Sequence, residues 1–412
     1  MHDVTRELCL REARNVNFVN VLRGTSDQNP CTQSMQTSQG RISIHEKHKL
    51  ARYRNSEAHS IFMFGKYQFY KPELSFKLVR VLYLEPIKFE TFPSGILSLI
   101  HLRYIALKFF LLNGVYDRSI EGGPSSIIYI PPSILNLCYL ETLRLDVSDP
   151  YDKTSLILPL EIFMLPQLRH LHLTRLYLHN YGITEKSLVL KNLHRLIGLN
   201  PRYCTEFFFR RFPNLKELQI RGFFEDFCSL KDLRDFHYLD QLEELEFHLE
   251  LPTIYDRKTV VSPWLLPPPC AFPQGLTKLA FAGHFLLPWK DLSIVGKLPK
   301  LESLELSSDA FIGDEWEVAE EGFPRLKFLL LNSLQFRHWR ASSDHFPCLE
   351  RLIIDWCRKL DSIPQEFADI TTLTLIDISN CEQSVGNSAK QIQQVIEDNY
   401  GGSIDVYIPD CS

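Results

Sequence analysis

The 412-residue chain is 45% hydrophobic and 23% charged, a composition typical of a globular protein with a large buried core. Its net charge of −5 is small for this length, which argues against a broad electrostatic surface for nucleic acid. No apolar run approaches the roughly 18 residues that a membrane-spanning helix needs, and the charged N-terminus is unlike a signal peptide. Composition therefore predicts no nucleic-acid partner and no integral membrane segment.

The first 57 residues precede the repeated apolar pattern that occupies most of the chain. Residues 3–22 have apolar residues at helical spacing after Asp3, a residue typical of helix starts, and Gly24 follows, so we expect one helix. Residues 25–40 are polar, with Pro and Gly, and indicate a flexible linker. We therefore assign 1–24 to a helix and 25–57 to a linker with a short strand at Arg41–His45.

A second strand-like run, Ala58–Gly65, opens a repeated pattern with the spacing L-x-x-L-x-L. One copy is Leu349-Leu352-Ile354, with Cys357 where leucine-rich repeats place Asn or Cys. The pattern predicts a short strand with two inward side chains, followed by a turn. The other copies are Val79-Leu82-Leu84, Leu102-Ile105-Leu107, Leu140-Leu143-Leu145, Leu168-Leu171-Leu173, the degenerate Leu193-Leu196, Leu215-Leu218-Ile220, Leu242-Leu245-Phe247, Leu276-Leu279-Phe281, Leu301-Leu304-Leu306, Leu326-Leu329-Leu331 and Leu373-Ile376-Ile378.

Most gaps between copies fall in the range of roughly 20–29 residues that is typical of leucine-rich repeats. One repeat cannot bury its apolar edge alone, but stacked copies cover each other. An ordinary leucine-rich α/β domain would not keep this period. The sequence therefore predicts an α/β leucine-rich-repeat solenoid over 58–385, a horseshoe with a parallel sheet on its concave face, preceded by the short helix and linker.

Two long gaps, 108–131 and 248–273, interrupt the array. The second is rich in proline and is not expected to be helical. Each is either a rim loop that binds a partner or a wider connection without one. After the last copy, Ser388–Asn399 has a helical pattern and Ile404–Ile408 a strand pattern, so 386–412 are expected to cap the core.

The cysteines are scattered singly, without C-x-x-C or paired caps, and no Asn stands in an N-x-S/T sequon. Secreted repeat proteins usually have paired-cysteine caps and glycosylation sequons. Because this chain has neither, the sequence favours a reducing, cytoplasmic location.

No motif for catalysis or metal binding is present. The chain lacks a phosphate-binding G-x-x-x-x-G-K-S/T, H-E-x-x-H, G-x-S-x-G and any zinc-spaced Cys/His cluster. His170 and His172 alternate on one strand face, but two ligands do not define a metal site. We therefore predict a protein that is not an enzyme, with no catalytic, cofactor or metal site.

The residues that flank the inward leucines are expected to form an exposed, protein-binding face, because side chains alternate along a strand. Phe328, Leu330, Ile353 and Trp356 would then form an apolar patch that marks a protein contact, against the alternative of scattered surface residues. The full predicted set is Tyr83, Tyr104, Lys108, Arg144, His170, His172, Glu217, Gln219, Arg221, Glu244, Glu246, Glu305, Phe328, Leu330, Arg351, Ile353 and Trp356.

These features together resemble the C-terminal part of coiled-coil-type plant NLR immune receptors of the late-blight-resistance type. The resemblance rests on Met1-His2-Asp3, similar to the M-H-D motif that ends their nucleotide-binding region, then R-I-S-I-H, A-H-S-I-F-M-F-G and the irregular repeats. It implies that residues 1–24 are the end of a winged-helix segment. The phosphate loop and the rest of the ADP/ATP pocket of full-length members do not occur here, so His2 matches the motif without its pocket.

The resemblance implies a recognition module that senses a pathogen effector or a guarded host protein and regulates a nucleotide-binding module in plant defence. It also implies ADP or ATP in full-length members and no cofactor in this chain. The alternative is a leucine-rich-repeat substrate adaptor of a ubiquitin ligase. Such adaptors need an N-terminal helical module, for which a single helix at 3–22 is short.

Overall fold

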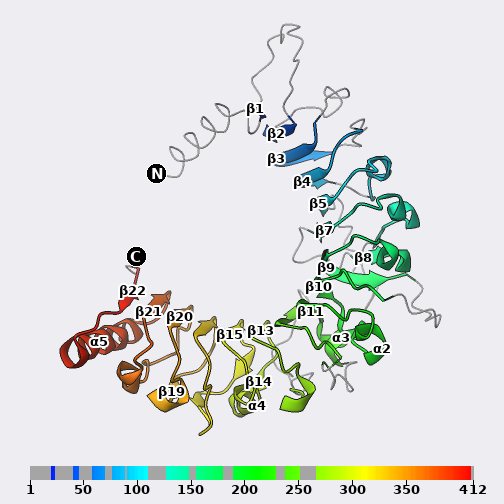
Figure 1. Cartoon of the computed structure of the whole chain (residues 1–412). Coiled ribbons are helices and arrows are strands. Elements are labelled where there is room, and N and C mark those ends of the chain that lie inside the picture. The colour runs from blue at the N-terminus through cyan, green and yellow to red at the C-terminus, as the bar shows by residue number, and fades with distance from the viewer. Residues whose placement is uncertain are drawn as a thin grey trace, which may run out of the picture. The chain divides into compact units, whose positions relative to one another are not determined.

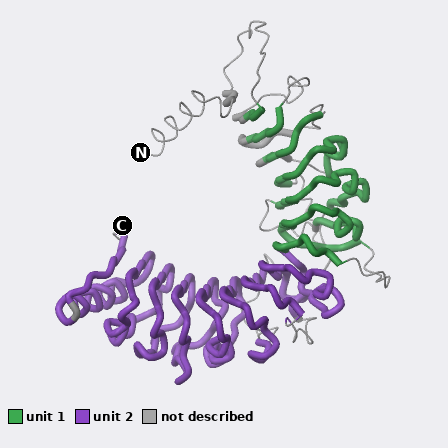
Figure 2. The backbone as a smooth tube through the Cα atoms, viewed as in Figure 1, with its two compact units in different colours: residues 1–196 green, residues 197–412 purple. Residues whose placement is uncertain are grey.

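A computed structural model describes residues 20–23, 40–45, 58–69, 77–88, 91–109, 127–147, 155–179, 189–228, 236, 238–250 and 266–409. The chain divides into two compact units, residues 1–196 and 197–412 (Figure 2). The strand β10 (Arg195–Leu199) includes the division point. The M-H-D match at Met1–Asp3, including His2, lies outside the described residues.

Unit 1 is built on a parallel sheet whose strands pair in the order β1-β2-β3-β4-β5-β7-β9 (Figure 1). A short side branch pairs β6 with β8 and β8 with the second half of β9. The strands are β1 (Asn20–Arg23), β2 (Arg41–His45), β3 (Ser60–Phe69), β4 (Val81–Lys88), β5 (Tyr104–Phe109), β6 (Ile127–Tyr129), β7 (Thr142–Val147), β8 (Ser155–Leu158) and β9 (His170–Leu178).

The core of unit 1 is formed by the predicted aliphatic triplets. Leu82, Ile105, Leu143 and Leu171 stand in register on adjacent strands and are fully buried. The 3-10 helices η2 (Ser94–Ser98), η3 (Pro132–Asn136) and η4 (Leu160–Met164) each add a buried isoleucine to that core. Three repeats of unit 1 therefore share the same short turn, and neighbouring repeats bury each other's apolar edges.

Unit 2 contains parallel strands that pair in the order β11-β12-β13-β15-β18-β20-β21-β22. The parallel pairing and the repeating register confirm the predicted leucine-rich-repeat solenoid. These strands are β11 (Glu217–Phe223), β12 (Glu244–Glu250), β13 (Lys278–Ala282), β15 (Ser303–Ser307), β18 (Phe328–Asn332), β20 (Arg351–Asp355), β21 (Leu375–Ser379) and β22 (Asp405–Tyr407).

The side of unit 2 opposite its sheet carries short strands and helices. Two small parallel pairs, β14–β16 and β17–β19, connect neighbouring repeats there. A stack of buried rings runs beneath them, in which the ring centroid of Trp316 lies 5.0 Å from those of both Trp289 and Trp339. The elements are β14 (Leu287–Pro288), β16 (Phe311–Ile312), β17 (Glu315–Glu317), β19 (His338–Arg340), η5 (Pro201–Tyr203), α2 (Glu206–Phe209), α3 (Phe224–Cys228), η7 (Pro269–Ala271), η8 (Trp289–Asp291), α4 (Leu292–Gly296), η9 (Ser343–His345) and η10 (Gln365–Asp369).

The C-terminal cap follows the prediction, with shifted bounds. The helix α5 (Gln383–Tyr400) buries Val385, Ala389, Ile392 and Ile396 and ends at Gly401, whose left-handed backbone accommodates the turn. β22 then pairs with β21 at the end of the sheet. The helix and β22 therefore cover the apolar edge of the repeat that contains β21.

One sequence prediction at the start of the chain needs correction. Residues 20–22 are not helical: they belong to β1, which pairs with β2 in register from Asn20↔Ile42 to Arg23↔His45. The apolar spacing there fits a helix or a strand, and hydrogen bonding to β2 decides between them. The sheet therefore begins before residue 58.

The bounds of the two insertions also change. Residues 108–109 belong to β5, 127–129 form β6 and 248–250 belong to β12. Within its described residues, the proline-rich segment contains a single 3-10 turn, η7. The turn tolerates Pro269 at its start, because the backbone N–H that proline lacks would have no partner within the turn there. The rest of both insertions lies outside the described residues.

Candidate protein-binding face

The exposed strand face of unit 2 is arranged in rows, because register-paired residues on adjacent parallel strands point the same way. The first row is Glu217, Glu244, Lys278, Ser303, Phe328, Arg351, Leu375 and Asp405. The second row is Gln219, Glu246, Ala280, Glu305, Leu330, Ile353, Asp377 and Tyr407. The predicted alternation of inward and outward residues therefore occurs along these strands, except on β13, where Ala280 in the second row is buried.

Four apolar side chains adjoin one another on this face, and we call Phe328, Leu330, Ile353 and Leu375 the apolar patch. Leu330 and Ile353 are direct register partners on β18 and β20. All four are half-buried in this structure. The guanidinium of Arg351 lies 5.4 Å from the centroid of the Phe328 ring and covers one side of the patch. Apolar side chains that stay partly exposed on adjacent strands are typical of a protein contact.

Leu375 is the member that the sequence analysis missed. It pairs with Arg351 on the neighbouring strand, two residues before Ile353 and on the same face. The signal was available, because Leu375 directly precedes the inward Ile376 in its triplet, as Phe328 and Arg351 directly precede Leu329 and Leu352.

Trp356 is not placed as predicted. It follows β20 instead of lying on it, and its backbone is left-handed, with φ of 54°. Ser308, Ser333 and Asn380 occupy the equivalent exits from β15, β18 and β21, also with positive φ. Trp356 is 44% exposed and carries the guanidinium of Arg358 at 4.4 Å from its ring centroid. It is therefore a rim residue beyond the end of β20.

Charged side chains border the apolar patch on the β11–β15 side. Lys278 on β13 pairs with Glu305 on β15 at 2.6 Å. Burial works against the charge of Lys278, but its bond to Glu305 outweighs burial and raises its pKa. Burial likewise opposes ionisation of Glu246, yet hydrogen bonds from His248 and Gln219 hold its pKa below the usual value. Glu217 and Glu244 stand side by side in the first row. At this border, the contacts of Lys278 and Glu246 therefore favour their charged forms.

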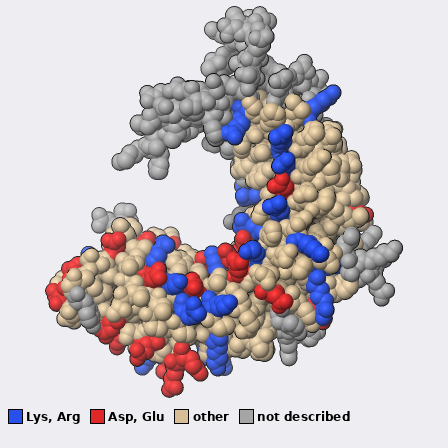
Figure 3. Space-filling model, in the orientation of Figure 1, with Lys and Arg blue, Asp and Glu red and all other residues tan. Residues whose placement is uncertain are grey.

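Unit 1 has an aromatic hollow of about 530 Å³ on its own strand face. Phe62, Val81, Tyr83 and Tyr104 line it, and the rings of Phe62 and Tyr83 lie 6.3 Å apart. The sequence predicted Tyr83 and Tyr104 but not Phe62 or Val81. Figure 3 shows Lys and Arg side chains following one another along this unit.

Two other predicted residues of unit 1, Arg144 and His172, both lie beside Asp146. Arg144 Nε lies 2.6 Å from Asp146 Oδ2, and His172 Nε2 lies 3.5 Å from Asp146 Oδ1. Burial, then the charges of Arg195, His194 and Arg169, lower the pKa of His170. No group of three or more His, Cys, Asp or Glu could hold one metal ion within the ranges that the structure describes.

The repeat geometry agrees with the comparison against known families. A model described as "Leucine-rich repeat region" matches residues 57–399. The chain belongs to the leucine-rich repeat family. Modules of this family are protein-interaction modules, and none of the described helices is long and apolar enough to cross a membrane.

Curated relatives are plant disease resistance proteins. The chain is 32% identical over 336 residues to a late blight resistance protein homolog of Solanum demissum, covering 79% of this chain and 23% of that protein. It is 28% identical over 416 residues to a disease resistance RPP8-like protein of Arabidopsis thaliana, covering 93% and 43%. These matches confirm the resemblance to the leucine-rich-repeat part of plant NLR proteins. The chain thus spans less than half the length of either relative.

A solved leucine-rich repeat protein of Leptospira interrogans is 14% identical, with a TM-score of 0.41 and coverage of 89% of each chain. The strand register and the family match establish the fold, and the similarity to the Leptospira protein adds nothing to them.

Proposed function

We propose that this chain is a non-enzymatic recognition module of a cytoplasmic plant immune receptor, and that it senses a pathogen effector or a guarded host protein. The proposal rests on the apolar patch, where side chains from three adjacent strands are presented together. Apolar clusters surrounded by charged residues are where binding energy concentrates in protein interfaces. The relatives' names, all of disease resistance proteins, support the defence role.

In the same proposal, the repeats also regulate a nucleotide-binding module. ADP or ATP would bind to that module, and this chain alone would hold no cofactor, because none of its sequence supplies a phosphate loop. The ubiquitin-ligase adaptor alternative gains nothing from the comparisons, in which the relatives are resistance proteins.

A pull-down from infected leaf extract tests the patch. The variant Leu330→Asp/Ile353→Asp places two charges within it, and the control Asn387→Asp/Gln391→Asp places the same charges on the exposed side of α5. We expect mass spectrometry to find a set of proteins that wild type and control retain and the patch variant loses. Retention of the same set by all three proteins would remove the patch from the proposal.

A further inference from the structure

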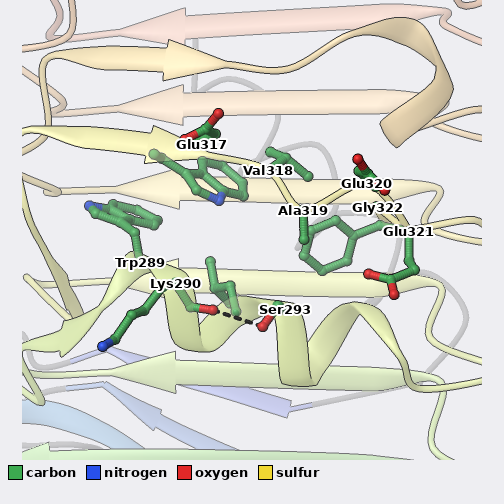
Figure 4. A pocket seen from close by; sticks show the side chains of 12 residues that line it. Trp289, Lys290, Ser293, Glu317, Val318, Ala319, Glu320, Glu321 and Gly322 are labelled. Carbon is green, nitrogen blue, oxygen red and sulfur yellow. Dashed lines mark hydrogen bonds between the residues drawn. The ribbon is translucent and has the colours of Figure 1, made fainter.

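A cleft of about 350 Å³ lies on the side of unit 2 opposite the exposed strand face. Figure 4 shows its two walls: Lys290 and Ser293 come from η8 and α4, and Glu317–Gly322 come from the end of β17 and the segment after it. Trp289, Trp316 and Phe323 form an apolar floor and are each nearly buried. The cleft is therefore an apolar groove whose upper wall is a short acidic segment.

Backbone contacts hold the two walls in place. A Cβ atom on Gly296 of α4 would lie 2.4 Å from the Gly322 carbonyl oxygen, so only glycine allows this approach. Trp289 Nε1 donates to the Gly313 carbonyl at 3.2 Å, and Val318 N donates to the Arg340 carbonyl at 3.0 Å. The cleft therefore exists before any ligand arrives, which lowers the entropic cost of binding.

The acidic wall lacks compensating charge. Glu317, Glu320 and Glu321 are exposed and make no ion pair within the part of the chain that the structure describes. Arg340 stands opposite Glu317 in register but pairs with Glu315. Lys290 is the one cation among the lining residues, and its side chain points away from the cleft in Figure 4. Figure 3 shows acidic side chains gathered along this edge of unit 2.

The arrangement of these carboxylates favours a cationic side chain over a metal ion as the ligand. Among the described residues, they do not form a group that could hold one metal ion. A long cationic side chain satisfies both parts of the cleft, because its aliphatic stem packs on apolar surface while its charged end stays at the rim. We propose that this cleft binds an arginine or lysine side chain of a basic segment in a protein partner. This site is separate from the apolar patch and does not depend on its role.

Fluorescence anisotropy with a labelled hexapeptide of alternating glycine and arginine tests the site, and the same peptide with citrulline for arginine controls for charge. The variant Glu317→Gln/Glu320→Gln/Glu321→Gln removes three carboxylates and keeps their shape. The control Glu366→Gln/Glu382→Gln/Glu397→Gln removes three exposed carboxylates elsewhere in unit 2. Ala319→Phe fills the cleft without changing its charge.

We expect wild type to bind the arginine peptide in preference to the citrulline peptide. The cleft triple variant should bind about tenfold more weakly, since three exposed ion pairs together contribute roughly that factor, and the control triple variant should match wild type. Ala319→Phe should weaken binding as well, with its melting temperature confirming that it is folded. Equal binding of the two peptides, equal losses in both triple variants, or full binding by Ala319→Phe would each overturn the proposal.

Discussion

Gly322 offers the sharpest test of how the repeats of unit 2 stack. Its backbone is left-handed, with φ of 54°, and an added Cβ would lie 2.5 Å from the His345 carbonyl oxygen and 2.6 Å from the His345 Cα. These are backbone atoms of the next repeat, drawn close by the hydrogen bond from Phe323 N to the His345 carbonyl at 2.7 Å. Alanine therefore cannot be accommodated by moving a flexible side chain.

Gly401 provides a matched control. Its φ is 61°, nearly that of Gly322, but a Cβ there would meet no atom within 4 Å. Gly401→Ala should cost about 1–2 kcal/mol for the left-handed backbone alone. Gly322→Ala should cost that amount plus about 1–3 kcal/mol for the forced displacement of the neighbouring repeat.

Urea unfolding followed by tryptophan fluorescence measures both costs from the shift in midpoint at unchanged slope. We expect the midpoint of Gly322→Ala to fall clearly below that of Gly401→Ala. Equal midpoints would refute the close contact between Gly322 and His345 and, with it, the tight packing of these two repeats.

Three further predictions concern binding and ionisation. Phe328→Ala/Trp356→Ala should weaken partner capture in a pull-down while circular dichroism still shows one cooperative melting transition; unchanged capture would remove these rings from the contact. The isolated chain should show no rise in melting temperature with ADP, and a clear rise would mean that it contains a nucleotide pocket. The pKa of Glu246 is lowered on folding, so its charge stabilises the fold above the unfolded pKa, and this contribution disappears as pH falls through the folded pKa. Glu246→Gln should therefore be less stable than wild type at neutral pH and equal to it in acid; a difference independent of pH would contradict this interpretation.

The repeat period made the strands and most of the exposed face predictable. Leu330 directly follows the inward Leu329, and Ile353 directly follows the inward Leu352 in the next repeat. Parallel stacking of these two repeats therefore brings Leu330 and Ile353 side by side. Trp356 could not be placed in this way, because alternation stops where the backbone turns left-handed after Asp355. The left-handed turn depends on hydrogen bonds to the next repeat, such as Trp356 N to the Ser379 carbonyl.

Other features depend on contacts between segments far apart in sequence. β1 was mistaken for a helix because its apolar spacing fits both structures, and only pairing with β2 distinguishes them. The acidic run around Glu317–Glu321 is visible in the sequence, but the opposite wall of its cleft belongs to the preceding repeat. Composition could not reveal that these two segments face each other.

Hydroxyl-radical footprinting of the apolar patch tests the proposed recognition face most directly, because it reads the exposure of individual side chains with and without a retained partner. We predict that oxidation of Phe328, Leu330, Ile353 and Leu375 falls when the partner binds. Oxidation of Tyr139, which is 51% exposed on unit 1, should stay unchanged. A partner that binds while all four patch residues remain as reactive as before would contradict the assignment of this face as the recognition surface.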